Sequence, residues 1–297
     1  NHKALRLVLC GDKEGAIKLF QNTLKLDENF SDPYFHLGNI YIQSGNYKSS
    51  ETMYKKAIGI DPNKSEYYYN LAIAQSNLEE TNKAIKNYKK CLKLDPNNTK
   101  AIKFLGNCFK DIKNFKEAMK TYNDWINLEP ENPEPVVCNS LIHVRNGRFD
   151  IGWKMYEAGL QNNIRELLNG FYEEKHQHWD GKSFEGTLLV YGEQGLGDQI
   201  FYGTLLPDLL KVQKNIYCKI DHRLHNLFKE NFPSIKFFKQ NEQIDKNSYE
   251  KYISIGSLSK FYRKHTNDYM NSEFKQYSFS QNFPEIGSTE SLDVMTW

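Results

Sequence analysis

The sequence predicts an α-solenoid of stacked helical hairpins, followed by an α/β domain with a parallel sheet. Two observations carry this prediction. Through the first half of the chain the same kinds of residue return every 34 residues. After about residue 185, short runs of strand-forming residues alternate with helical patterns, and a glycine-rich turn follows the first run.

The repeat is marked by an acidic residue followed by proline, at Asp61-Pro62, Asp95-Pro96 and Glu129-Pro130. Their spacing of 34 residues is the tetratricopeptide period. Proline is expected to end each unit because it cannot donate the internal hydrogen bond of a helix. Each unit also has a small residue that we expect to let its two helices approach closely, at Gly38, Ala72 and Gly106. A tyrosine in each unit is expected to fill the space between hairpins, at Tyr54, Tyr88 and Tyr122.

Weaker units flank these three, so residues 1–160 are predicted to form four to five hairpins in a right-handed superhelix. Ala16 and Phe20 repeat the phase at one end, and Gly147 and Gly152 at the other. The last hairpin is atypical, as terminal repeats are. Residues 161–185 are predicted to be a polar connector, and residues 186–297 the α/β part. The chain begins without methionine and inside a repeat, so we expect it to be a fragment at that end.

The first helices of the hairpins are predicted to line a groove that binds a peptide or protein segment. The residues expected to line it are Phe35, Asn39, Gln43, Tyr69, Asn77, Lys103 and Asn107. Asn39 and Asn107 would grip backbone amides, but Ile73 interrupts the series between them. The alternative for any single residue is a tolerated position on an exposed face.

The composition is that of a polar globular protein, with 39 basic and 37 acidic residues and a formal charge of +2. This balance gives no reason to expect nucleic acid or an anionic membrane as the main partner. Five scattered cysteines without a CxxC pair favour a reducing, cytoplasmic compartment. No apolar run approaches the length of a membrane span. His176 and His178 lack a third ligand in a recognised spacing, so no metal site is predicted.

The α/β part begins with a strand at 187–191, and the turn Gly192-Glu193-Gln194-Gly195-Leu196-Gly197-Asp198 leads into a helix. Further strands are expected at 216–220, 235–238 and 252–255, with a helix at 222–232. The turn lacks the third glycine of the dinucleotide fingerprint and the Gly-Lys-Ser/Thr ending of a P-loop. Asp198 has two candidate roles. Spacing alone favours a helix cap, and the alternative is a base that accepts a proton from a hydroxyl in the cleft beyond the strands.

The segments Trp179-Asp180-Gly181, Gly186–Val190 and Glu193–Asp198 resemble bacterial tetratricopeptide-repeat proteins with a glycosyltransferase-like C-terminal half. Gly152-Trp153 and Ile255–Leu258 resemble further landmarks of that family. The resemblance implies a Rossmann-like domain that is the N-terminal, acceptor-side half of a GT-B fold, related in architecture to heptosyltransferases and O-GlcNAc transferases. It also implies that Asp198 is the catalytic base, with Gly195 and Gly197 shaping the loop and Gln194 and Glu193 beside it.

The family binds its nucleotide sugar mainly in a second α/β domain, and only about forty residues follow Ser257. We therefore expect the donor domain to be missing, and the chain to be inactive as a fragment and to hold no cofactor. The complete protein would be an inverting transferase that moves a sugar from a nucleotide sugar to a hydroxyl acceptor. The alternative is a non-catalytic scaffold that binds protein through the repeats, and a third hypothesis is oligomerisation through the repeats.

Overall fold

A computed structural model describes residues 2–160, 177–192, 195–265 and 267–268 of the 297-residue chain. The chain divides into two compact units, residues 1–135 and residues 136–297. The division falls inside a helix at the end of the repeats, α9 (Glu134–Arg145). Each unit has its own buried core and is described by itself.

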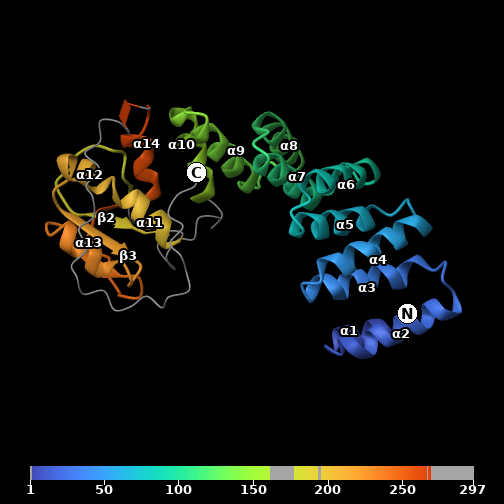
Figure 1. Cartoon of the computed structure of the whole chain (residues 1–297). Helices are drawn as coiled ribbons and strands as arrows, with labels where there is room; N and C mark the ends of the chain where they lie inside the picture. The colour runs from blue at the N-terminus through green and yellow to red at the C-terminus, as the bar shows by residue number, and fades with distance from the viewer. Residues whose placement is uncertain (1, 161–176, 193–194, 266, 269–297) are drawn as a thin grey trace. The chain divides into compact units, whose positions relative to one another are not determined.

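Unit 1 is an array of antiparallel helical hairpins (Figure 1). Each hairpin packs against the next, and the second helix of one contacts the first helix of the following one. The helices are α1 (His2–Leu9), α2 (Lys13–Leu26), α3 (Ser31–Gln43), α4 (Tyr47–Ile60), α5 (Ser65–Asn77), α6 (Thr81–Leu94), α7 (Thr99–Asp111) and α8 (Phe115–Leu128). The tetratricopeptide-type solenoid predicted for this part of the chain is confirmed.

The turn inside each hairpin repeats at the predicted period. One residue of each turn has a positive φ, and these residues stand 34 apart: Gly11, Gly45, Glu79, Lys113 and Gly147. Glycine adopts this conformation without steric cost, whereas Glu79 and Lys113 adopt it although they carry a Cβ. After the turn, Asn46 and Asn114 cap the second helix by accepting a hydrogen bond from the backbone N–H three residues on. The turn geometry therefore extends the repeat through α9 and α10 (Phe149–Tyr156).

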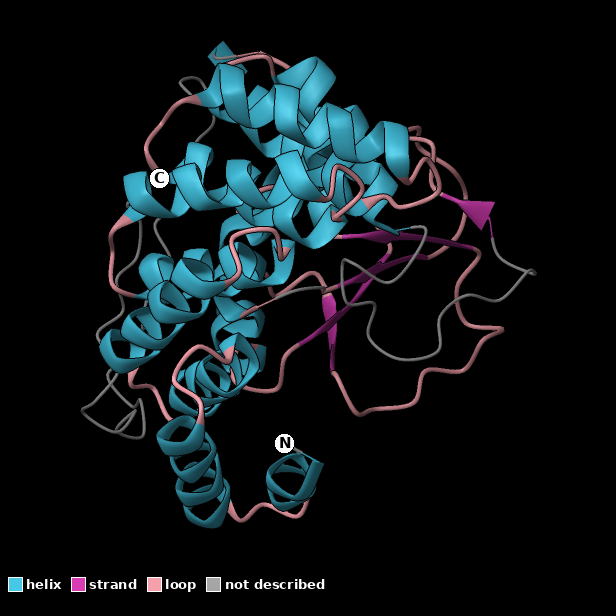
Figure 2. Cartoon of the chain, turned by 90° about the vertical axis from the view of Figure 1, so that its right-hand side faces the viewer, coloured by secondary structure: helices cyan, strands magenta, loops and turns pink. Residues whose placement is uncertain are grey.

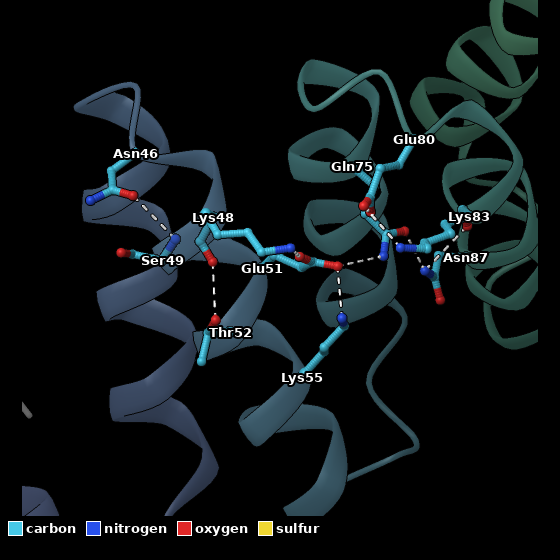
Figure 3. A network of polar contacts seen from close by, with 10 residues as sticks. All are labelled: Asn46, Lys48, Ser49, Glu51, Thr52, Lys55, Gln75, Glu80, Lys83 and Asn87. Carbon is cyan, nitrogen blue, oxygen red and sulfur yellow. Dashed lines mark hydrogen bonds and ion pairs between the residues drawn. The ribbon is translucent and has the colours of Figure 1, made fainter.

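A buried carboxylate ties two hairpins of unit 1 together (Figure 3). Glu51 on α4 accepts hydrogen bonds from Lys48 Nζ at 2.9 Å, Lys55 Nζ at 2.7 Å and Gln75 Nε2 of α5 at 3.1 Å. Gln75 Oε1 in turn accepts from Asn87 Nδ2 of α6 at 2.7 Å. Burial alone would raise the pKa of Glu51, but the lysines and Gln75 lower this pKa to about 2.

Unit 2 is a five-stranded parallel sheet of order β1-β5-β2-β3-β4 with helices packed against it (Figure 2). The strands are β1 (Gln177–His178), β2 (Leu188–Tyr191), β3 (Ile216–Ile220), β4 (Lys236–Lys239) and β5 (Lys251–Ser254). The helices are α9, α10, η1 (Glu157–Leu160), α11 (Leu196–Gly203), α12 (Leu206–Val212), α13 (His225–Asn231), η2 (Gly256–Leu258) and α14 (Ser259–Tyr262). The parallel sheet predicted for this part is confirmed, and the four predicted strands agree with β2–β5 within one residue at each end.

The core of unit 2 lies on one face of the sheet. Leu188, Val190 and Ile253 pack there with leucines of α11–α13 and with Trp153 and Tyr156 of α10. The hairpin α9–α10 is therefore part of the core of the α/β unit, although its sequence continues the repeat. The opposite face carries a smaller cluster in which Leu189 packs against Ile244 and Tyr249.

The segment predicted to be a connector contributes to this unit. Its described part contains β1, which pairs with β5, and Trp179, whose side chain is 1 % exposed. Trp179 Nε1 donates to the Lys182 carbonyl at 2.7 Å, so its one polar atom is paired. His176 lies outside the described residues.

We predict that Glu51→Gln destabilises unit 1 by on the order of 2 kcal/mol at pH 7, because the neutral amide no longer pairs with Lys48 and Lys55. A carboxylate whose pKa is lowered in the folded state stabilises that state above its unfolded pKa. The difference between the two proteins should therefore shrink as the pH falls from about 4.5 toward 2. Urea unfolding across this range measures it. Glu66→Gln, at an exposed glutamate of α5, is the control, and a difference independent of pH would contradict the assignment.

Candidate functional site

The hairpins α3–α4 and α7–α8, which flank the middle repeat α5–α6, each hold an asparagine in a fixed orientation. The Tyr54 hydroxyl of α4 donates to Asn39 Oδ1 of α3 at 2.6 Å, and the Tyr122 hydroxyl of α8 donates to Asn107 Oδ1 of α7 at 2.7 Å. Burial raises the pKa of Tyr54 to about 12, so its hydroxyl keeps its proton and acts as the donor. The tyrosine hydroxyl thereby fixes the orientation of each amide, whose Nδ2 group can donate to a ligand.

This pairing requires a glycine next to each asparagine. A Cβ on Gly38 would lie 2.5 Å from the ring of Tyr54, and one on Gly106 would lie 2.4 Å from the ring of Tyr122. Carbon atoms that are not bonded to one another do not come this close, so the rings reach the asparagines only across a bare backbone. The close approach predicted for these glycines is confirmed, and it positions a polar group as well as packing two helices.

The middle repeat departs from this arrangement in both positions. Ala72 and Ile73 stand where the outer repeats have glycine and asparagine. The buried Tyr88 hydroxyl makes no hydrogen bond of good geometry among the described residues. Burial raises its pKa, and the nearby Ser76 side chain opposes this shift. The Tyr88 ring stacks on Phe104 of α7 at 6.2 Å and contacts Tyr69 of α5 at 6.1 Å. The centre of the array is therefore aromatic where its two ends are polar.

The other predicted groove residues lie on α3, α5 and α7 in different surroundings. Phe35 packs on Tyr67 of α5 at 4.9 Å, and Tyr69 contacts Phe104 at 6.3 Å, so neighbouring first helices are joined by rings. Gln43 and Asn77 are exposed, and Asn77 Nδ2 donates to the Ile73 carbonyl at 2.9 Å. Lys103 pairs with Glu134 and lies over the ring of Trp125. Its charge is therefore partly neutralised within the unit.

The second candidate region is the carboxyl edge of the sheet in unit 2. Glu193 and Gln194 lie outside the described residues, whereas Gly195 and Gly197 are exposed at the start of α11. Asp198 lies in the first turn of α11 and is half-buried. Burial raises the pKa of Asp198, while a hydrogen bond from the backbone of Gly195 lowers it, and the net direction is upward. Gly195 is the N-cap residue of α11, and Asp198 stands three residues after it. A contact from this position back to the backbone of the N-cap residue is one half of a capping box.

The strand order makes this edge a switch point. From β2 the chain runs through α11 and α12 to β3 and on to β4, and it then returns across the sheet to β5 on the other side of β2. In open parallel sheets ligands bind at such a point, beyond the carboxyl ends of the strands. Asp198 follows β2 and Ser257 follows β5, and α11 contacts η2.

Two further side chains, those of Glu157 and Gln199, brace this edge, and the sequence offers no sign of their role. Glu157 accepts hydrogen bonds from Ser257 Oγ and from Lys260 Nζ, both at 2.7 Å, and thereby ties the end of α10 to the segment after β5. Gln199, next to Asp198, accepts from the Asp221 backbone N–H at 3.0 Å. These pairings join residues up to 103 positions apart, so no local pattern predicts them.

Among the described residues, no group of three or more His, Cys, Asp or Glu side chains is placed to hold a metal ion. In the same residues, every helix is too short or too polar to cross a bilayer.

Comparison with known proteins identifies the repeats. The TPR repeat family matches residues 38–79, and the tetratricopeptide repeat family matches residues 65–98. This part of the chain therefore consists of tetratricopeptide repeats, and both matches lie within unit 1. Protein FlbA of Caulobacter vibrioides is 27 % identical over 94 residues, which is 30 % of this chain and 15 % of FlbA. The chain thus spans about a seventh of the length of that relative.

Solved structures of MamA resemble about half of the chain. One has a TM-score of 0.52 at 23 % identity, covering 54 % of this chain and 94 % of that chain. The MamA RS-1 ArsTM double mutant has a TM-score of 0.51 at 15 % identity, covering 54 % of this chain and 90 % of that chain. At these identities the likeness shows the fold.

We predict that the three equivalent tyrosines respond differently to loss of the hydroxyl. Tyr54→Phe and Tyr122→Phe should each cost about 1 kcal/mol of unfolding free energy, because each removes a hydrogen bond to an asparagine. Tyr88→Phe should be neutral or stabilising, because it removes a buried hydroxyl without a partner. Urea unfolding of the three variants measures this, and equal losses at all three positions would refute the pairing.

Proposed function

We propose that this chain is a protein-interaction scaffold whose repeats hold a peptide or protein segment along α3, α5 and α7. The observation that supports it best is the matched pair of oriented amides. Asn39 and Asn107 occupy the same position two repeats apart, and each is held by a tyrosine with its donor group left to bind. An extended segment offers backbone carbonyls along its length, which suits two separated donors.

The middle repeat supports the same proposal through a different contact. Tyr69, Tyr88 and Phe104 form an aromatic cluster between the two asparagines, and Phe104 remains 37 % exposed. A segment bound by its backbone at both ends would place one apolar side chain against this cluster. Polar donors would then fix the position of the segment, and the aromatic centre would select its side chain.

The test uses the full chain and a library of random twelve-residue peptides. Selected peptides are expected to carry an apolar residue near the middle. The double variant Asn39→Ala, Asn107→Ala should weaken their binding about tenfold, since each lost hydrogen bond is worth about 1 kcal/mol or less. Asn82→Ala, at an exposed asparagine of α6, is the matched control. Selected peptides that bind both variants as tightly as the parent would count against the proposal.

A second candidate function concerns unit 2. The proposal is that it forms the acceptor-side half of a GT-B glycosyltransferase, with Asp198 as the base that takes a proton from the acceptor hydroxyl. It is supported by the place of Asp198 beside the switch point of a parallel sheet, and by burial that raises its pKa toward the range useful for a base. The competing role, a helix cap, is supported by the contact with Gly195.

The two roles of Asp198 are separated by measuring sugar transfer from radiolabelled nucleotide sugars together with stability, in the complete protein. Asp198→Asn retains an oxygen for the cap but cannot accept the proton. Transfer should therefore fall about 100-fold or more, with little change in unfolding temperature. Asp124→Asn, at an exposed aspartate of α8, is the control. A transfer rate equal to that of the parent would exclude Asp198 as the base and leave the helix cap as its role.

A further inference from the structure

Positive charge in unit 1 is concentrated in one stretch. Residues 81–120, which cover α6, α7 and the first part of α8, contain eleven lysines and three acidic residues. This stretch has a formal charge of +8, whereas the whole chain has +2. The balance of the overall composition therefore conceals a strongly basic segment.

On α6 the lysines share one face. Lys83, Lys86, Lys89, Lys90 and Lys93 are all exposed, and α6 contains no acidic residue. At 100° per residue they fall within an arc of about 120°. The buried residues of the helix, Ala84, Ile85, Tyr88 and Cys91, occupy the opposite side. We call these five residues the lysine stripe.

Two lysines of the lysine stripe lie over aromatic rings. Lys89 Nζ lies 5.2 Å from the ring centre of Phe109, and Lys90 Nζ lies 5.7 Å from that of Tyr68. Packing against a ring restricts a lysine stem while its ammonium group stays in water. A partner would therefore lose less side-chain entropy on binding here than on binding free lysines.

The protein neutralises only one end of the lysine stripe. Lys83 pairs with Glu80 at 2.9 Å (Figure 3), whereas no carboxylate among the described residues lies within 4.0 Å of the other four ammonium groups. Like charges three and four positions apart on a helix repel one another. The lysine stripe is thus an unfavourable arrangement in the free protein, and an anionic partner would relieve the repulsion.

We propose that the lysine stripe is a second binding surface, which takes an acidic helix of a partner protein. Lys86, Lys90 and Lys93 repeat at the spacing of one helix face, and glutamates at the same spacing on a partner would meet them. The stripe contains lysine and no arginine, and no aromatic ring is exposed on α6, so it lacks the bidentate and stacking groups typical of nucleic-acid sites. It also lacks exposed apolar side chains that could enter a membrane.

The experiment compares the full chain with a variant in which Lys86, Lys89, Lys90 and Lys93 are changed to Gln. Glutamine keeps helix propensity and removes the repulsion between the lysines, so the unfolding temperature should stay the same or rise. The probe is a synthetic helical peptide with glutamates at i, i+3, i+4 and i+7. We expect it to bind the parent chain and to lose about tenfold or more in affinity with the variant. Binding should also weaken as salt rises from about 50 to 200 mM.

The control variant changes four exposed lysines elsewhere, Lys18, Lys25, Lys214 and Lys229, to Gln and should bind as the parent does. Equal losses in both variants would reduce the effect to net charge and overturn the proposal, as would absence of binding to the parent. Tighter binding of a single-stranded oligonucleotide, or of vesicles containing phosphatidylserine, would also overturn it. The lysine stripe lies on the second helix α6 and shares no residue with the asparagine pair on α3 and α7, so the two experiments use different variants.

Discussion

The contact between a bare backbone and a tyrosine ring is the constraint on which the repeats depend. The Tyr54 ring lies against Gly38, and the Tyr122 ring lies against Gly106. In both hairpins a methyl group on the glycine would not fit. This contact sets the distance between the two helices, and the resulting spacing carries the hydroxyl to the neighbouring asparagine. The packing of the two helices and the orientation of the asparagine are thereby set by the same pair of residues.

The middle repeat shows that this constraint acts on two positions at once. With a Cβ at Ala72, the Tyr88 ring cannot take the place that Tyr54 takes beside Gly38. An asparagine at position 73 would then have no positioned donor, and the sequence has Ile73 there. The buried Tyr88 hydroxyl without a well-placed hydrogen bond lowers the stability of the folded state, and the stacking of its ring on Phe104 offsets part of this loss. The aromatic centre between two polar ends thus coincides with the one repeat that has alanine in place of this glycine.

Much of the fold follows from the sequence because its signals are local. A 34-residue period identifies the hairpins, and short apolar runs identify β2–β5. The sequence does not predict β1, which has two residues and depends on pairing with β5. Nor does it reveal that Glu157 pairs with Ser257 and Lys260, because those partners lie about a hundred residues away. The role of Asp198 stays a prediction, since its position suits a cap and a base equally.

The hairpin α9–α10 shows how a repeat can change its role without leaving its period. Gly147 has the turn conformation of the other hairpins, and Gly152 packs against Val144 with no room for a Cβ. Trp153 and Tyr156, however, bury their rings in the core beside β2 and contact Tyr202 of α11. A helix that presents aromatic residues can cover a sheet as well as another hairpin, because both surfaces are apolar and accept the same side chains. The period therefore reports how a hairpin is built, and the aromatic residues on its outer face decide which core it joins.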